Sequence, residues 1–414
     1  MPDGRYAKLR KALYGLRRSP RLWYEELSRF LASLGYLPIE ADPCVFMNAT
    51  TGGILLAYVD DIVLFTRTKV QMAELKKLIF GKYKCHDLGP ISYYLGIRVR
   101  RNRSQRSIEL SMEPYIDKLV SDFKRTNAYP RTTPMDVAAL KLKFRAPKDR
   151  APEQLLQRYQ SLIGKILYPA SQLRTDVAFH VGYLARAMSN PTETHYQYAL
   201  QVVDYLKTTK DLVMAFTAPD SNTKLSIDVF SKASPYFNQE HPGLGLHAYS
   251  DAAFADSEDR KSTSGYLFKL AGGTICHRSC KQNLVTTSTT EAEYVALTYA
   301  TKEATWLYRL LTQLGYMGKD TKPVKLYGDN QPSIQLVHAE GHHERTKHVD
   351  IYYHYIKDRV KAGHITLKHV RTHEMAADGL TKPLDRLAHQ RFLNQVGLRK
   401  PMINVSNYEE PAYL

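Results

Sequence analysis

Cysteine is scarce in this sequence, which argues against a fold held together by disulfides. Only four cysteines occur among 414 residues, and so few in a long chain do not make the disulfide framework of small secreted domains. The first residues also lack the pattern of a secretory signal. We therefore expect an intracellular protein from a reducing compartment.

Long apolar runs are absent as well. The longest, such as residues 54–59, are far too short to cross a bilayer, so we expect a soluble protein with no membrane partner. Hydrophobic residues still make up 43% of the chain, and its length exceeds the size to which one core usually grows. Two or three packed units are expected.

Acidic residues are outnumbered by basic ones. The 58 lysines and arginines against 41 aspartates and glutamates give a net charge of +17, which is typical of a surface that meets nucleic-acid phosphates. Charge that only keeps the protein soluble is the alternative. The basic residues gather in two stretches, which we expect to follow a nucleic-acid backbone: Arg5, Lys8, Arg10, Lys11, Arg17, Arg18 and Arg21, then Arg98, Arg100, Arg101, Arg103 and Arg106.

Apolar periodicity in the first 218 residues predicts helices with a few strands between them. Ser19 and Pro20 predict the N-cap and first turn of a helix. Apolar residues 54–59 and 62–65 predict a β-hairpin with Asp60 and Asp61 at its turn. Further elements are predicted as a helix at 70–83, a strand at 93–99, a helix from Pro114, a proline-rich connection at 131–152, and helices at 157–170 and 193–207.

The pattern changes after a polar segment, residues 219–242, that predicts a domain boundary. Strands are then predicted at 246–250, 265–270 and 274–278, a long helix at about 290–314, a strand at 324–328, a helix at 347–361, a strand at 365–370 and a helical segment near Ala376. Three strands followed by alternating helix and strand predict an α/β unit with a mixed sheet.

Adjacent carboxylates at the turn of the first hairpin indicate a metal site. Asp60 and Asp61 repel each other unless a cation lies between them. Mg²⁺ accepts a few carboxylate oxygens and leaves room for phosphate oxygens. A solvated Asp-Asp turn is the alternative, and the pair alone does not decide between the two readings.

The surroundings of this pair resemble the reverse transcriptases of copia-type retrotransposons. Tyr58-Val59-Asp60-Asp61 is similar to their catalytic hairpin, Leu13-Tyr14-Gly15-Leu16-Arg17-Arg18-Ser19-Pro20-Arg21-Leu22-Trp23 to the segment before it, and Tyr94-Leu95-Gly96-Ile97 to their primer-gripping strand. The resemblance implies nucleic-acid contacts by Tyr94 and Gly96, together with Arg17, Arg18 and Arg21.

The second half resembles the ribonuclease H domain of the same elements. The similar segments are Tyr249-Ser250-Asp251-Ala252, Arg260-Lys261-Ser262-Thr263-Ser264-Gly265-Tyr266, Glu291-Ala292-Glu293-Tyr294, Asp329-Asn330 and Ala377-Asp378. The resemblance implies that Lys261 contacts nucleic acid. Residues 345–350 are similar to a family motif at a helix start, which implies that Lys347 and His348 contact the phosphates of a hybrid or support the sheet.

Four carboxylates form the candidate ribonuclease site. Asp251 and Asp329 are expected to end two strands, Glu293 to lie early in the long helix and Asp378 to begin the last helix. In a ribonuclease H-like sheet these ends converge, and the quartet can hold two Mg²⁺ or Mn²⁺ ions. Two ions are likewise expected at the polymerase site with Asp60 and Asp61. The family's pattern assigns the metal to Glu293 and leaves Glu291 to cap the helix.

Histidines and cysteines are weaker candidates. His373 lies shortly before Asp378, where many ribonucleases H place a mobile histidine that helps product release; a solvated loop histidine is the alternative. Cys276, His277 and Cys280 have no second ligand pair at a usable spacing, so a partly buried strand is expected rather than a zinc site. His277 and Cys280 also replace the Trp and Lys usual in relatives, which bears on substrate grip.

The resemblance implies a domain order and a fold. It predicts a partial α+β reverse transcriptase palm at 1–130, thumb or connection helices at 131–218, a linker at 219–243, a ribonuclease H-like three-layer α/β domain with a mixed five-stranded sheet at 244–400, and a tail at 401–414. The first catalytic Asp of the family's palm belongs to an upstream strand and is not in this sequence.

The resemblance also implies an activity and partners. The expected function is the copying of element RNA into DNA, with hydrolysis of the RNA strand of RNA–DNA hybrids as the activity expected of this chain. The partners would be an RNA template, a DNA primer, the hybrid, deoxynucleotides where the palm is completed, and the rest of the Pol polyprotein, in cytoplasmic virus-like particles or the nucleus. A catalytically decayed nucleic-acid-binding relic is the alternative. An integrase is disfavoured, because its three acids have a different spacing.

Overall fold

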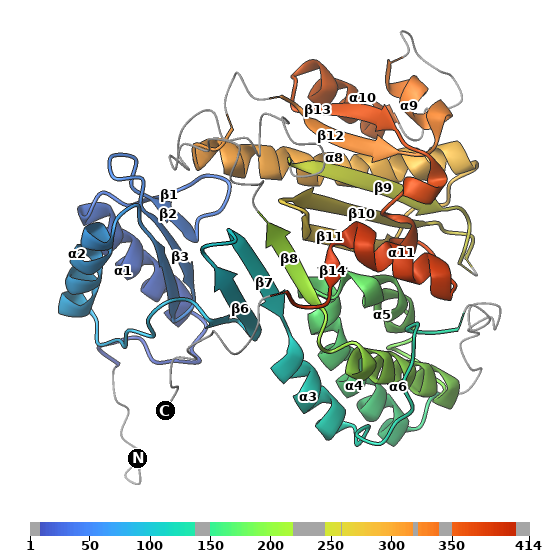
Figure 1. Cartoon of the computed structure of the whole chain (residues 1–414), viewed down its shortest axis with the longest axis horizontal. Helices are drawn as coiled ribbons and strands as arrows, with labels where there is room; N and C mark the ends of the chain where they lie inside the picture. The colour runs from blue at the N-terminus through green and yellow to red at the C-terminus, as the bar shows by residue number, and fades with distance from the viewer. Residues whose placement is uncertain are drawn as a thin grey trace. The chain divides into compact units, whose positions relative to one another are not determined.

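The computed structural model describes residues 9–136, 150–217, 245–257, 259–317, 322–338 and 350–402. The chain divides into two compact units, shown in Figure 1. Residues 1–89 and 309–318 belong to the first unit, and most of the remaining chain belongs to the second.

The first unit contains a four-stranded antiparallel sheet in the order β1-β2-β3-β4, with two helices. Its elements are α1 (Ser19–Ser33), β1 (Leu37–Pro38), β2 (Val45–Met47), β3 (Ile54–Tyr58), β4 (Asp61–Phe65) and α2 (Lys69–Lys82). Leu55 packs in one core cluster with Leu31 of α1 and Leu75 of α2. Its neighbour Ile54 packs in another with Leu310, because successive side chains of a strand point to opposite faces.

The predicted hairpin is confirmed. Strand β3 pairs with β4 in antiparallel register, and Tyr58 is opposite Asp61, so Val59 and Asp60 form a two-residue turn. The predicted helices of this unit are also present. Ser19 is the first residue of α1, not its N-cap, which is Arg18.

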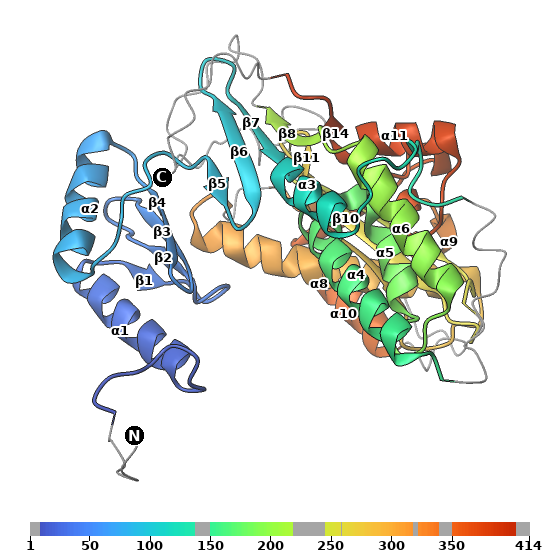
Figure 2. The ribbon, with the colours of Figure 1, turned by 90° about the horizontal axis from the view of Figure 1, so that it is seen from below.

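The second unit begins with a five-stranded antiparallel sheet in the order β14-β8-β7-β6-β5. Its strands are β5 (Tyr93–Tyr94), β6 (Ile97–Asn102), β7 (Ser107–Ser111), β8 (Val213–Thr217) and β14 (Leu398–Arg399). The helices are α3 (Glu113–Asp122), α4 (Glu153–Gln172), the 3₁₀ turn η2 (Thr175–Val177), α5 (Ala178–Ala185) and α6 (Glu193–Thr208). Figure 2 shows α4, α5 and α6 side by side. Strands β7, β8 and β14 and helix α5 were not predicted.

The prediction of one continuous strand over residues 93–99 is wrong. The backbone turns sharply at Leu95 and Gly96, whose φ angles are 49° and 77°, and Tyr94 then pairs with Ile97. Glycine adopts this left-handed conformation at little cost, which favours a tight hairpin turn here. The apolar run therefore folds into β5 and β6.

A second five-stranded sheet follows, in the order β11-β10-β9-β12-β13. Its elements are β9 (His247–Ala253), β10 (Thr263–Leu270), β11 (Gly273–Lys281), α8 (Thr289–Gln313), β12 (Val324–Gly328), α9 (Gln331–His338), α10 (Asp350–Lys361), β13 (Ile365–His369) and α11 (Arg386–Val396). Strand β9 is antiparallel to β10 and parallel to β12. The sheet is mixed, as predicted, and the mixed α/β fold class is confirmed.

The faces of this sheet are covered by different elements. Gln282 donates to Ser264 of β10 and to the Ala292 carbonyl of α8, so Ser264 lies on the α8 side. Gly265 lies against Leu380 on the opposite side. The predicted helix near Ala376 is instead a pair of 3₁₀ turns, η4 (Thr372–Glu374) and η5 (Asp378–Leu380), and α11 follows them without having been predicted.

A buried ion pair joins the helical layer of the second unit to α11. Arg174 and Asp176 in and beside η2 are 1% and 0% exposed and lie 2.7 Å apart from Nη2 to Oδ2. The Tyr205 hydroxyl donates to Asp176 at 2.7 Å and lies 2.8 Å from His389 Nε2. Burial alone would raise the pKa of Asp176, but the Arg174 guanidinium outweighs it and the pKa is lowered.

Replacing Asp176 by Asn should therefore destabilise the fold strongly. The change leaves the Arg174 charge buried without its partner, which typically costs about 3–5 kcal/mol. Urea unfolding of the whole chain measures it. As a matched control, Asp117→Asn removes the acid of an exposed pair with Lys210, also 2.7 Å long, and should change stability by less than about 1 kcal/mol. Equal losses in the two variants would contradict this account.

Candidate functional site

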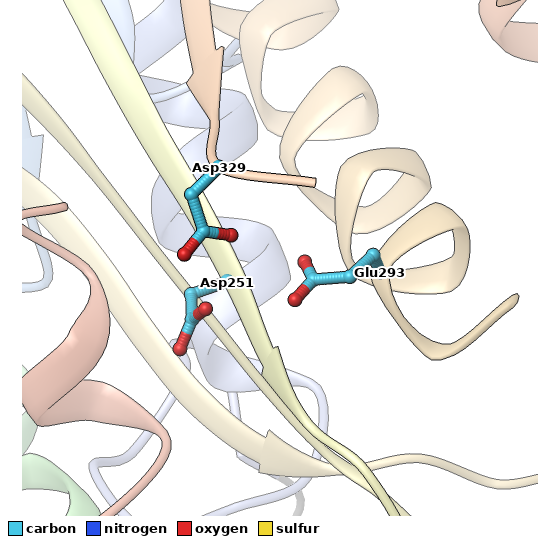
Figure 3. Close-up of side chains that lie close together, drawn as sticks. All are labelled: Asp251, Glu293 and Asp329. Atoms are coloured by element: carbon cyan, nitrogen blue, oxygen red, sulfur yellow. The ribbon is translucent and has the colours of Figure 1, made fainter. Parts of the chain in front are cut away.

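Three of the four predicted carboxylates lie together at one place in the second unit (Figure 3). Asp251 lies on the central strand β9, Glu293 near the start of α8, and Asp329 directly after β12. One oxygen of each carboxylate lies within 4.8 Å of the others. Asp251 does not end its strand as predicted, since β9 continues to Ala253. Its carboxylate still meets those at the end of the parallel strand β12 and the start of α8, which makes a set of hard oxygen ligands suited to a divalent cation.

The fourth carboxylate, Asp378, lies beside this group but outside it. It begins η5, not the last helix as predicted, and its Oδ1 lies 2.7 Å from Lys382 Nζ. The Thr381 hydroxyl connects the two parts, because it donates to Asp251 and lies 3.1 Å from the Asp378 carbonyl. The negative charge of Asp378 still acts on Asp251 and Glu293.

A glycine allows η5 to come this close. Gly265 of β10 is paired directly with Asp251. A Cβ atom at Gly265 would lie 2.7 Å from Leu380 Cβ and 2.8 Å from Thr381 Cγ2. Any larger residue would push η5 away from β9, and with it the Thr381 hydroxyl that holds Asp251.

The carboxylates of this group repel one another. Burial raises the pKa of Asp251 to about 6, and the charges of Asp378 and Asp329 add to the effect, while the Thr381 hydrogen bond opposes it. Burial also raises the pKa of Glu293 well above its usual value, with Asp251 as the next cause. Such a group is stabilised either by protons or by a cation. The residues therefore fit the divalent metal that the sequence predicted.

Glu291, the neighbouring acid to which the sequence assigned helix capping and not metal binding, has a different role from Glu293. Its Oε2 accepts hydrogen bonds from the Thr287 backbone at 2.6 Å and the Thr287 hydroxyl at 2.8 Å. Its backbone N–H bonds to the Ser288 hydroxyl. Glu291 thus stabilises the start of α8, as predicted.

The predicted polymerase residues lie in the first unit. Asp60 and Asp61 are exposed at the β3–β4 turn, and Val59 between them and Tyr58 has a φ of 53°, which is unusual for a β-branched residue. The Trp23 indole N–H of α1 donates to the Val59 carbonyl at 2.8 Å. Within the described residues, Asp60 and Asp61 are not joined by a third possible metal ligand.

The remaining predicted residues are placed as follows. Arg17, Arg18 and Arg21 are exposed, Lys261 is half-buried, Tyr94 lies on β5, Gly96 is in the turn that follows it, and His373 is exposed on η4. Lys347 and His348 lie outside the described residues. None of these positions tests a contact with nucleic acid.

The prediction that Cys276 and Cys280 lie on a partly buried strand is confirmed. Cys276 and Cys280 are free, half-buried thiols on β11. His277 between them lies 2.7 Å from the Ala170 carbonyl and 3.1 Å from the Thr175 hydroxyl. It therefore joins β11 to α4 and η2 in place of holding a metal.

Two residues of the site were missed from the sequence. Thr381 and Lys382 follow Asp378 closely, and a hydroxyl and an ammonium three and four positions after an acid at a turn can both reach back to it. That spacing is the signal that could have indicated them.

The raised pKa of Asp251 predicts a pH dependence of stability in the absence of divalent metal. A carboxylate with a pKa near 6 when folded and near 4 when unfolded holds its proton longer in the folded state. Its contribution to stability is therefore complete below about pH 4 and is lost as the pH rises through about 6, by up to roughly 3 kcal/mol.

Urea unfolding in EDTA between pH 4 and 7 measures this slope. Asp251→Asn should flatten it, and saturating Mg²⁺ should restore stability at pH 7. A wild-type slope equal to that of Asp251→Asn would contradict the prediction.

The amino-acid sequence is similar to a reverse transcriptase family and to the Pol polyproteins of plant transposons. Residues 2–137 match the family model described as Reverse transcriptase (RNA-dependent DNA polymerase). The chain is 34% identical over 402 residues to the Retrovirus-related Pol polyprotein from transposon TNT 1-94 of Nicotiana tabacum, covering 94% of this chain and 28% of that protein. It is 33% identical over 396 residues to the polyprotein from transposon RE1 of Arabidopsis thaliana, covering 95% of this chain and 25% of that one.

Solved structures show more distant similarity. LC11-RNase H1 in complex with an RNA/DNA hybrid is 16% identical, with a TM-score of 0.26, covering 33% of this chain and 93% of that one. A foamy viral protease-reverse transcriptase in complex with double-stranded DNA is 14% identical, with a TM-score of 0.43, covering 86% of this chain and 49% of that one. No helix in the described part of the chain is long and apolar enough to cross a membrane.

The family assignment rests on the sequence relatives, since the match extends over nearly the whole chain. The chain spans about a quarter of the length of the curated relatives it matches. It belongs to the family of copia-type retrotransposon Pol polyproteins, with a reverse transcriptase segment at residues 2–137 and a mixed five-stranded α/β sheet after it.

Proposed function

We propose that the second unit hydrolyses the RNA strand of RNA–DNA hybrids. The observation that carries the proposal is the convergence of Asp251, Glu293 and Asp329 within 4.8 Å, on a mixed sheet with the strand order β11-β10-β9-β12-β13. Mutually repelling buried carboxylates are costly in a purely structural role. A bound Mg²⁺ or Mn²⁺ ion would offset the repulsion among these carboxylates.

Asp251, Glu293 and Asp329 would hold the metal through their oxygens, and Asp378 would complete a site for a second ion. A bound pair of divalent ions activates a water and stabilises the leaving oxygen in phosphodiester hydrolysis. The protein's own residues set the geometry of this site. Thr381 fixes one oxygen of Asp251, and Gly265 keeps η5 in contact with β10.

The expected substrate follows from charge. An excess of 17 positive charges over negative ones favours a polyanion, with binding that weakens as salt rises. Arg260 and Lys261 lie in the connection between β9, which carries Asp251, and β10. We expect them to meet the phosphates of the hybrid.

A second function is proposed for the first unit, within a longer Pol polyprotein. Asp60 and Asp61 project from a hairpin turn whose carbonyl is held by Trp23, and this arrangement supports a part in nucleotide addition. The third palm carboxylate would come from a segment outside this sequence. RNA template, DNA primer and deoxynucleotides would then be its substrates.

One experiment separates the two functions and the non-catalytic alternative. The purified chain is incubated with an end-labelled RNA–DNA hybrid and Mg²⁺, and RNA products are resolved on a gel. We expect cleavage that Asp329→Asn reduces at least about a hundredfold, because one ligand of the metal is lost. Asp60→Asn should leave cleavage unchanged, since the hairpin belongs to the other site.

Two outcomes of this experiment would contradict the proposal. Cleavage that survives Asp329→Asn would remove the assignment of the site. Salt-dependent binding of the hybrid by the wild-type chain without any cleavage would favour the non-catalytic relic.

A further inference from the structure

We propose that Lys382 is a positioning residue of the metal centre, whose ammonium group takes the place of a divalent cation at Asp378 and must be displaced before a second ion can bind. The inference rests on the proposed function, since it concerns the same carboxylates. Lys382 would thereby raise the Mg²⁺ concentration that is needed for the second ion to bind.

The ion pair of Lys382 divides the carboxylates into two unequal parts. Asp251, Glu293 and Asp329 form the compact group, in which one oxygen of each carboxylate lies within 4.8 Å of the others. Asp378 lies outside that group and is paired with Lys382 at 2.7 Å. An ion that binds at Asp378 therefore meets a positive charge already in place beside one of its ligands.

The surroundings of Lys382 distinguish it from an ordinary surface lysine. Its ammonium is influenced by the charges of Asp251 and Asp329 as well as by its partner Asp378. Its backbone is held near the site, because its N–H donates to the Asp378 carbonyl at 3.3 Å. Lysine is a compact point charge with three donors, which can satisfy carboxylate oxygens as a metal ion does.

Displacement of this ammonium is physically feasible. The Lys382 side chain is 48% exposed and that of Asp378 is 22% exposed, so the lysine end of the pair faces solvent and has room to move, although the Asp378 Oδ1 that it contacts is buried. A lysine that is half exposed gains little from a single ion pair, and a divalent ion carries twice the charge. The pair should therefore retard binding of the second ion without preventing it.

The test is a Mg²⁺ titration of the whole chain by isothermal titration calorimetry, without nucleic acid. The heat that remains in Asp251→Asn is subtracted as binding elsewhere. In Lys382→Met, which keeps the length of the side chain but removes its charge, the second ion should bind about two- to fivefold more tightly than in the wild type. Lys382→Arg should not show this gain.

A matched control removes a comparable lysine away from the site. Lys210 forms a 2.7 Å pair with Asp117 and is 40% exposed, and Lys210→Met should leave both Mg²⁺ affinities unchanged. Thermal unfolding of each variant verifies that it is folded. If Lys382→Met is not folded, Lys382→Gln takes its place in the titration.

Failure of this inference and failure of the proposed function give different results. If the wild-type centre binds Mg²⁺ and Lys382→Met binds the second ion equally or more weakly, Lys382 only supports the turn and the inference is overturned. If the wild type shows no Mg²⁺ binding beyond that of Asp251→Asn, the metal centre itself is overturned.

Discussion

The second unit depends on one constraint, the repulsion among carboxylates placed around the buried Asp251. The sheet brings these groups together because β9 is central and β12 runs parallel beside it. Burial, and in addition their mutual charges, raise the pKa of Asp251 and Glu293. In the metal-free chain the Thr381 hydroxyl and the Lys382 ammonium offset part of that repulsion, and a bound divalent cation would offset it more completely.

The surrounding structure holds this unfavourable arrangement in place through a second, fully satisfied polar cluster. Arg174 and Asp176 form a buried ion pair, and Tyr205 extends it to His389 on α11. Because α11 follows η5 in the chain, fixing α11 also limits the movement of Asp378. Buried charges require this kind of pairing. At the candidate metal site the described partner of the buried Asp251 is the neutral hydroxyl of Thr381, so a bound cation would offset its charge further.

Much of this could be predicted from local sequence, and the exceptions have tertiary causes. The hairpin of Asp60 and Asp61 and the strands of the mixed sheet follow from apolar runs bounded by turn residues. The stretch at residues 93–99 was also predicted as a single strand, but the left-handed turn at Leu95 and Gly96 divides it. Asp378 was identified as a candidate, yet the role of Lys382 depends on which charges surround it in space, and no sequence pattern gives that.

The central claim is that the carboxylates around Asp251 form a divalent metal centre. A crystal of the whole chain grown or soaked in Mn²⁺ tests it most directly, because Mn²⁺ replaces Mg²⁺ at oxygen sites and its position is given by anomalous scattering. The account predicts a peak bonded to oxygens of Asp251, Glu293 and Asp329, absent in Asp329→Asn. Occupied Mn²⁺ sites elsewhere on the chain, with none at these three residues, would contradict it.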